Sequence, residues 1–175
     1  MKRRIFLASL MLLITAAVVF PDGLKEIKEI LTGYEEVPAL STTGGGELRA
    51  RISRDGTSIS YQLSYSDLEG NVTQSHIHLG NPGVNGGISV FLCTNLNNGP
   101  AGTQPCPPAP ATITGTLTAA DVIGPAGQGI GPGEFSELVQ AIRARSTYVN
   151  IHSSKYPGGE VRKQILPDEK GDHDH

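Results

Sequence analysis

The sequence contains no tryptophan, only two cysteines, and no basic stripe or patch of the kind that follows a phosphate backbone. Its 14 basic residues stand against 17 acidic ones, which gives a formal net charge of -3. Binding to a phosphate backbone requires a basic stripe or patch, so nucleic acid is excluded as an expected partner. Catalytic serine or cysteine arrangements are also missing, because no serine lies in a nucleophile-elbow setting. Hydrolytic chemistry is therefore not predicted.

Turn-forming residues, in contrast, are abundant, with 22 glycines and 12 prolines. This composition indicates short strands separated by turns and disfavours long helices. Hydrophobic residues make up 38% of the chain, which is enough to build a core. The roughly 150 residues that remain after an export segment is set aside have the size of one domain.

The N-terminal segment has the pattern of an export signal. Lys2, Arg3 and Arg4 precede an uncharged apolar run over residues 5–20, as in a secretory signal peptide. We expect residues 1–22 to be a signal peptide or an uncleaved N-terminal anchor, and the protein to be exported to the periplasm, cell envelope or extracellular space. Contact with a membrane is expected only through this segment, if it stays uncleaved.

The two cysteines agree with export. Cys93 and Cys106 bracket a stretch rich in glycine, proline and asparagine that is typical of a loop. In an oxidising compartment they are expected to form a disulfide, which would stabilise the fold by roughly 3 kcal/mol through loop closure. A redox or metal-binding thiol pair would need closer spacing or nearby ligands.

Alternating hydrophobic residues predict most of the strands. Leu48, Ala50 and Ile52 alternate with charged residues, and after a turn at residues 54–56 the alternation resumes over residues 58–65, which predicts a hairpin. We expect an all-β fold, a Greek-key-like β-sandwich or barrel of about seven to nine short antiparallel strands. The other predicted strands cover residues 72–79, 87–93, 111–117, 147–152 and 160–166.

Three segments depart from this pattern. Residues 134–145 carry apolar side chains at helical spacing, with acidic residues early and basic residues late, which predicts one short helix packed on the sheet. Residues 24–31 fit either an amphipathic helix or an edge strand. The polar tail, residues 167–175, is expected to be disordered, with His173 and His175 in contact with solvent.

Three histidines lie inside predicted strands. In a strand, residues two apart project from the same face, about 7 Å from each other, so His76 and His78 point the same way, opposite to Ile77. In the segment TYVNIH, Asn150 and His152 share one face while Val149 and Ile151 would face the core. If the two strands are neighbours, the three imidazoles meet.

Three imidazoles without a thiolate suit copper, zinc, iron or nickel. The predicted metal ligands are His76, His78 and His152. Asn150, Tyr156, Glu160 and Arg162 are further candidates, as additional ligands or as residues that hold the ligands in place. The alternative is that these histidines are structural, because polar residues commonly occupy an outer strand face. The protein would then be a metal-free extracellular interaction module.

Four motifs resemble the CHRD domain family: LTGYEEVP at residues 31–38, SHIHLGNPGVNGG at 75–87, GTLTAADV at 115–122 and YVNIHSSKYPGGEVRKQI at 148–165. On this resemblance, residues 23–166 form a CHRD domain. The family pattern includes the three strand histidines, the turn before Glu160, and Arg162. Because these domains in chordin belong to an extracellular protein that binds growth factors, the resemblance implies an extracellular protein partner.

A second, local similarity concerns copper/zinc superoxide dismutase, whose copper ligands include an H-x-H strand pair and a later histidine. His76, His78 and His152 are similar to these in type and order, which makes copper the preferred metal and zinc the second choice. This sequence has no histidine between His78 and His152, so the zinc-site and bridging histidines of the enzyme are missing. Catalytic residues and dismutase activity are therefore not predicted.

Overall fold

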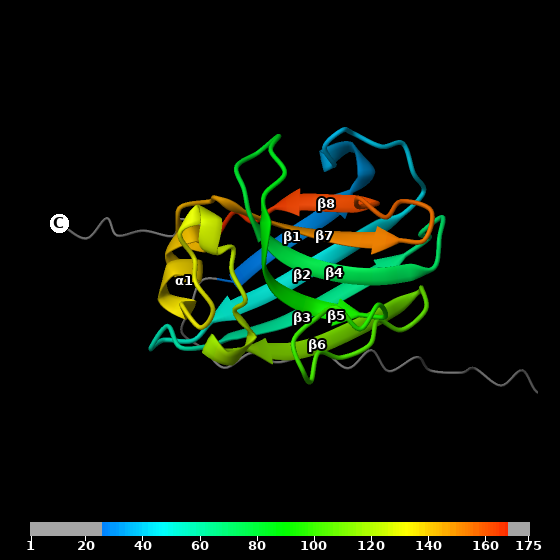
Figure 1. Ribbon diagram of the computed structural model, residues 1–175. Helices are drawn as coiled ribbons and strands as arrows, with labels where there is room; N and C mark the ends of the chain where they lie inside the picture. Colours follow the sequence, from blue (N-terminus) through cyan, green and yellow to red (C-terminus); the bar gives the residue numbers. More distant parts are fainter. Residues whose placement is uncertain (1–25, 168–175) are drawn as a thin grey trace, which may run out of the picture.

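The computed structural model describes residues 26–167, and Figure 1 shows their arrangement. The export segment predicted for residues 1–22 lies outside the described residues, as does the predicted tail from residue 168 onward. Within residues 26–167, no helix has the length and apolar character needed to cross a membrane.

Strands dominate the described part of the chain. One α-helix, α1 (Phe135–Arg143), and three short 3₁₀ helices, η1 (Gly33–Glu35), η2 (Ala119–Asp121) and η3 (Ala126–Gln128), lie between them. The eight strands are β1 (Glu26–Thr32), β2 (Gly45–Ile52), β3 (Ile59–Ser66), β4 (Val72–Leu79), β5 (Gly87–Thr94), β6 (Ala111–Leu117), β7 (Thr147–Ser153) and β8 (Val161–Gln164).

These strands form one antiparallel sheet in the order β5-β4-β7-β8-β1-β2-β3-β6. The two edge strands, β5 and β6, lie close together, since the Gln104 side chain donates both to the Leu92 carbonyl on β5 and to the Thr114 carbonyl on β6. The Tyr61 hydroxyl on β3 also donates to the Leu92 carbonyl, at 2.8 Å. The sheet is therefore a nearly closed barrel (Figure 1), and across its seam β3, β6, β5 and β4 follow in Greek-key order. The predicted all-β fold with one helix is confirmed.

Side-chain alternation explains the core. On β3, Ile59, Tyr61, Leu63 and Tyr65 are buried while the residues between them are half-buried. Full burial of a large apolar side chain contributes about 1.5–3 kcal/mol, so the inward-facing set of each strand holds the barrel together. The helix α1 covers one end of the barrel (Figure 1) and adds its apolar stripe to the same core.

The ambiguous segment before residue 32 is a strand. In β1, Ile27, Glu29 and Leu31 are buried, and the residues between them are exposed. This segment pairs with β2 along its whole length, but it meets β8 only at Thr32, opposite Arg162. Pairing with β2 makes this segment a strand rather than a helix. In the strand, the backbone groups form hydrogen bonds with β2 and every second side chain enters the core.

Strands β4 and β7 are neighbours, with Ile77 opposite Val149 and His76 opposite Asn150. Ile77, Val149 and Ile151 belong to the core, as the alternation predicted. The opposite face of β7 is also buried, since every residue of this strand is buried. The sheet face that carries the histidines is therefore covered rather than open to water.

Candidate metal centre

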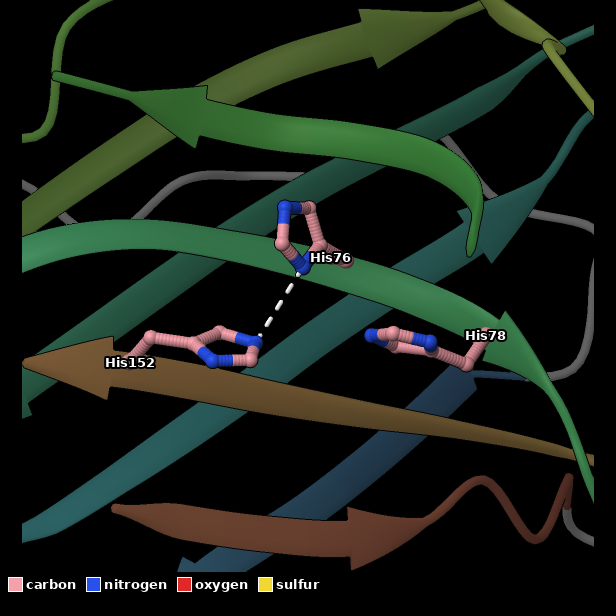
Figure 2. Close-up of side chains that lie close together, drawn as sticks. All are labelled: His76, His78 and His152. Atoms are coloured by element: carbon pink, nitrogen blue, oxygen red, sulfur yellow. Dashed lines mark hydrogen bonds between the residues drawn. The ribbon is translucent and has the colours of Figure 1, made fainter. Parts of the chain in front are cut away.

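The three strand histidines meet on the outer face of the barrel. His76 and His78 come from β4 and His152 comes from β7, and their rings turn toward one another (Figure 2). One nitrogen from each ring lies within 4.8 Å of the others. The relative exposure of the three side chains is 1%, 7% and 6%, respectively, so this is a buried cluster.

Backbone carbonyls set the protonation of two of these rings. His78 Nδ1 lies 2.9 Å from the Gly86 carbonyl oxygen, and His152 Nδ1 lies 2.9 Å from the Pro157 carbonyl oxygen. A carbonyl oxygen only accepts hydrogen bonds, so Nδ1 carries the proton and Nε2 carries the lone pair in each ring. Histidines that bind metals are oriented in this way by their second nitrogen.

His76 completes the cluster from the other side. Its Nδ1 lies 3.2 Å from His152 Nε2 (Figure 2). Because His152 Nε2 carries a lone pair, His76 Nδ1 donates its proton to that nitrogen in the metal-free protein. The Phe91 ring packs edge-on against His76 with 4.3 Å between ring centroids, and His76 Nε2 is buried without a hydrogen-bond partner. A metal ion between the two rings would replace the shared proton.

Burial keeps these imidazoles neutral. Loss of hydration lowers the pKa of His76 to about 2 and the pKa of His78 to about 4. Burial also lowers the pKa of His152. The neighbouring histidines lower the pKa of His76 and His78 further, since charges on adjacent rings would repel. Neutral imidazole is the form that binds metal ions, so the cluster is ready for one at neutral pH.

Asn150 is the fourth polar side chain in the cluster. Its Oδ1 lies 3.1 Å from His78 Nε2 and 3.1 Å from His152 Nε2. The residue is 2% exposed and sits opposite His76 in the pairing of β4 with β7. Of the additional candidates from the sequence, Asn150 is the one that the structure places within hydrogen-bond distance of the ligand nitrogens.

A loop supports one of the three rings. The connection between β4 and β5 folds back so that the Gly86 carbonyl reaches His78. A Cβ at Gly86 would lie 1.7 Å from the Leu79 carbonyl oxygen, so this close return requires glycine. The loop is fixed at Asn85, which accepts a hydrogen bond from Arg162 and donates one to the Val37 carbonyl.

Arg162 contacts the cluster indirectly, through Tyr148 and the β4–β5 loop. Its guanidinium lies 3.4 Å from the centroid of the Tyr148 ring, and Tyr148 in turn stacks on His78. The guanidinium also donates to Asn85 Oδ1 at 2.9 Å and to the Val84 carbonyl at 2.8 Å. Arg162 therefore links the β4–β5 loop to the stacked rings of Tyr148 and His78.

The other two sequence candidates lie elsewhere. The Glu160 carboxylate accepts hydrogen bonds from the Thr42 hydroxyl at 2.8 Å and from the Glu69 backbone N–H at 2.7 Å. The Tyr156 hydroxyl donates to the Glu69 carboxylate at 3.1 Å. These contacts fasten loops to one another, and the structure does not bring either side chain to the histidines.

One residue of the site was not predicted from the sequence. Burial raises the pKa of the Glu36 carboxyl to about 7, against the opposing effects of Arg162 and of the neighbouring Asn150 side chain. Its Oε1 lies 2.4 Å from the position that a Cβ of Gly159 would occupy. Glu36 follows β1 in a loop, so no strand periodicity points to it. The motif GYEEVP was the one signal that contained it.

The predicted disulfide is present, joining Cys93 on β5 to Cys106. Both cysteines are buried in the core. The bond ties the long connection between β5 and β6 to the end of β5. It lies on the barrel seam and contributes no atom to the histidine cluster.

Comparisons with known proteins place the chain in a family. The family model of the CHRD domain matches residues 27–165, which contain all three clustered histidines, Asn150 and Glu36. A search of curated proteins and a search of solved structures each gave no match. Because the match extends over nearly the whole described part of the chain, the protein belongs to the CHRD domain family.

Proposed function

We propose that this CHRD domain binds one transition-metal ion through His76, His78 and His152, with copper as the preferred metal and zinc as the second choice. The observation that supports this most is the convergence of three buried ring nitrogens, all within 4.8 Å of one another. Three imidazoles without a thiolate match the donors that copper and zinc accept.

The spacing of the donor atoms fits such an ion. A tetrahedral ion about 2.0–2.1 Å from its nitrogen ligands holds neighbouring ligands about 3.3 Å apart. The distance of 3.2 Å between His76 Nδ1 and His152 Nε2 agrees with this value. Ligation through His76 Nδ1 would take the place of the hydrogen bond between His76 and His152.

We propose a binding role, as a metal store or an electron-transfer centre, rather than turnover of a substrate. The three histidines are between 1% and 7% exposed, which leaves little access for a substrate. Copper would supply one-electron chemistry in such a centre, whereas zinc would be held without redox change. The residues described above would bind the ion and keep water away from it.

We further propose that the domain works outside the cytoplasm. The Cys93–Cys106 disulfide suits an oxidising compartment, where such bonds persist. The basic and apolar residues at the start of the sequence support the same conclusion.

A metal-free interaction module is the competing function. It is favoured by the contact between His76 and His152, since one ring can donate to the other without an ion. The two functions predict different metal contents in purified protein.

Elemental analysis of the untagged protein tests the proposal. His173 and His175 are replaced by alanine so that the tail binds no metal. Near-stoichiometric copper or zinc is expected, and His78→Ala is expected to abolish it because one of three ligands is removed. Gln62→Ala, on the polar outer face of β3, serves as the control. Negligible metal, or metal content that His78→Ala leaves unchanged, would establish the metal-free module instead.

A further inference from the structure

The Asn150 amide lies between a carboxylate and two imidazoles. On one side it faces the Glu36 carboxylate, and this contact lowers the pKa of Glu36. On the other side its Oδ1 lies 3.1 Å from His78 Nε2 and 3.1 Å from His152 Nε2. The two ends of an amide differ, because one only accepts hydrogen bonds and the other only donates them. The orientation of this group therefore determines what the imidazoles meet.

Glu36 determines that orientation. Once ionised, the Glu36 carboxylate only accepts hydrogen bonds, so the amide then presents its NH₂ group to Glu36. The carbonyl oxygen is then directed at the histidines. Both histidine nitrogens carry lone pairs, because their Nδ1 protons are donated to the Gly86 and Pro157 carbonyl oxygens. His78 Nε2 and Asn150 Oδ1 thus face each other with no proton between them, while His152 Nε2 accepts the proton of His76 Nδ1.

This arrangement is unfavourable unless a cation sits among these atoms. The opposite amide orientation would give His78 Nε2 an N–H donor and would suit a metal-free protein. The carboxylate that prevents it has little freedom to move. Glu36 is 6% exposed, and its Oε1 lies so close to Gly159 that a Cβ there would be only 2.4 Å away. The fold therefore maintains the orientation that suits a bound ion.

We propose that Asn150 Oδ1 is the fourth ligand of the metal ion and that Glu36 is a positioning residue that keeps this oxygen directed at the ion. This inference rests on the proposed metal-binding function. Three distances between the four donor atoms, 3.2 Å, 3.1 Å and 3.1 Å, are close to the spacing of about 3.3 Å between ligands of a tetrahedral ion.

The donor set carries a consequence for metal selectivity. Three imidazole nitrogens and one amide oxygen form a neutral set without a soft ligand. Oxygen donors favour harder cations, whereas soft sulfur ligands favour Cu(I). The site should therefore bind Cu(II) and Zn(II) more tightly than Cu(I). The Glu36 carboxylate would also place a negative charge near the ion, with only the Asn150 side chain between them. This charge favours a doubly charged cation.

The test compares three forms of the full-length chain, all carrying the alanine replacements at His173 and His175. These are the parent protein, Glu36→Gln, and the double variant Glu36→Gln with Asn150→Asp. The introduced glutamine can donate to Asn150 Oδ1 and so allows the amide to turn over. In the double variant the introduced carboxylate offers an oxygen in either orientation, so the orientation no longer matters. Glu29→Gln, at a buried carboxylate on β1, is the matched control.

Affinities for Zn²⁺ and Cu²⁺ are measured by competition with a chelator, and the Cu²⁺ forms are compared by electron paramagnetic resonance. Loss of a residue that supports a ligand lowers metal affinity by roughly 10–100-fold, and we expect this for Glu36→Gln, together with a changed spectrum. The double variant should regain most of the affinity and Glu29→Gln should retain it. Circular dichroism checks that each variant is folded. If Glu36→Gln does not fold, Asn150→Leu replaces it, with the same loss expected.

The outcomes separate the two proposals. A parent protein that binds neither ion refutes the metal-binding function itself. A parent that binds, with equal affinity and an identical spectrum in Glu36→Gln, overturns the role of Glu36. Weakened binding that the double variant fails to restore shows that Glu36 does not act through the amide, which also overturns it. Unchanged affinity in Asn150→Leu removes Asn150 from the ligand set.

Discussion

Tyr148 lies flat against His78, with ring centroids 4.6 Å apart and ring planes inclined by 3°. The two residues are direct partners in the pairing of β4 with β7. Stacking prevents the imidazole from rotating out of the plane in which its Nδ1 meets the Gly86 carbonyl. A core aromatic residue thus orients one of the proposed ligands.

Replacing Tyr148 by alanine is expected to cost about 3–5 kcal/mol of unfolding free energy, as for other buried aromatic residues, and to weaken metal binding. Tyr148→Phe keeps the stack and loses the hydroxyl that accepts a hydrogen bond from Gly86 N, so it should cost about 0.5–1.5 kcal/mol. Urea denaturation and chelator competition measure both effects. Equal metal affinity in Tyr148→Ala and the parent protein would show that the stack does not orient His78.

Gly86→Ala should disrupt the support of His78, because the added Cβ would lie 1.7 Å from the Leu79 carbonyl oxygen. The backbone would have to shift, and overpacking of this kind costs about 1–3 kcal/mol. We expect this loss in urea denaturation and a reduced metal affinity. Gly127→Ala is the control, since a Cβ there meets no atom within 4 Å, and it should change stability by less than about 0.5 kcal/mol. Similar behaviour of the two variants would contradict the prediction.

The stability of the metal-free protein should fall as the pH is lowered below about 6.5. Burial lowers the pKa of His76, His78 and His152 in the folded state, so the unfolded chain takes up protons first. Each histidine then removes up to about 1.4 kcal/mol of stability per pH unit. This contribution is complete above the unfolded value of 6.5 and is lost as the pH falls toward the folded values, about 4 for His78 and about 2 for His76.

Glu36 acts in the opposite direction. Burial raises its pKa from 4.5 to about 7, so its contribution to stability is present at low pH and is lost as the pH rises through this range. Three histidines outweigh one carboxylate, and the net effect is loss of stability in acid. Urea denaturation of metal-free protein at several pH values between 5 and 7.5 measures the slope. Glu36→Gln should steepen it, and a flat profile in the parent protein would refute the prediction.

Removing the disulfide is expected to destabilise the domain by about 2–4 kcal/mol, because Cys93 and Cys106 close a connection of 13 residues. Denaturation with and without a reducing agent, and of the double Cys→Ala variant, gives this value. Metal affinity should stay within a few-fold of the parent, since neither cysteine contacts the histidines. A large loss of metal binding on reduction would show that the barrel seam and the metal centre are coupled.

Much of the local structure followed from residue patterns. The alternation in residues 58–65 predicted β3 almost to the residue, since β3 runs over Ile59–Ser66. Helical spacing predicted α1 within the right segment. The segment before residue 32 remained ambiguous, because a short amphipathic run satisfies both periods. Pairing with β2 was needed to make it a strand.

The role of Glu36 and the burial of the histidines could not be predicted from such patterns. Glu36 reaches Asn150 through a loop, and loops carry no periodicity from which a side-chain direction can be predicted. An outer strand face with alternating polar residues ordinarily meets water. Here the histidines are buried, and the loops at Asn85 and Val37 are joined by a hydrogen bond; both features depend on the path of the whole chain.

By itself the sequence determined that His76 and His78 share one face of a strand and that Asn150 and His152 share one face of another, because side chains two apart in a strand project together. Only the tertiary structure decided that these strands are neighbours, so that residues 76 positions apart, His76 and His152, come within 3.2 Å. It also decided that the shared face is dry. Pleat geometry acts within a few residues, whereas strand pairing and loop closure depend on the packing of the entire barrel.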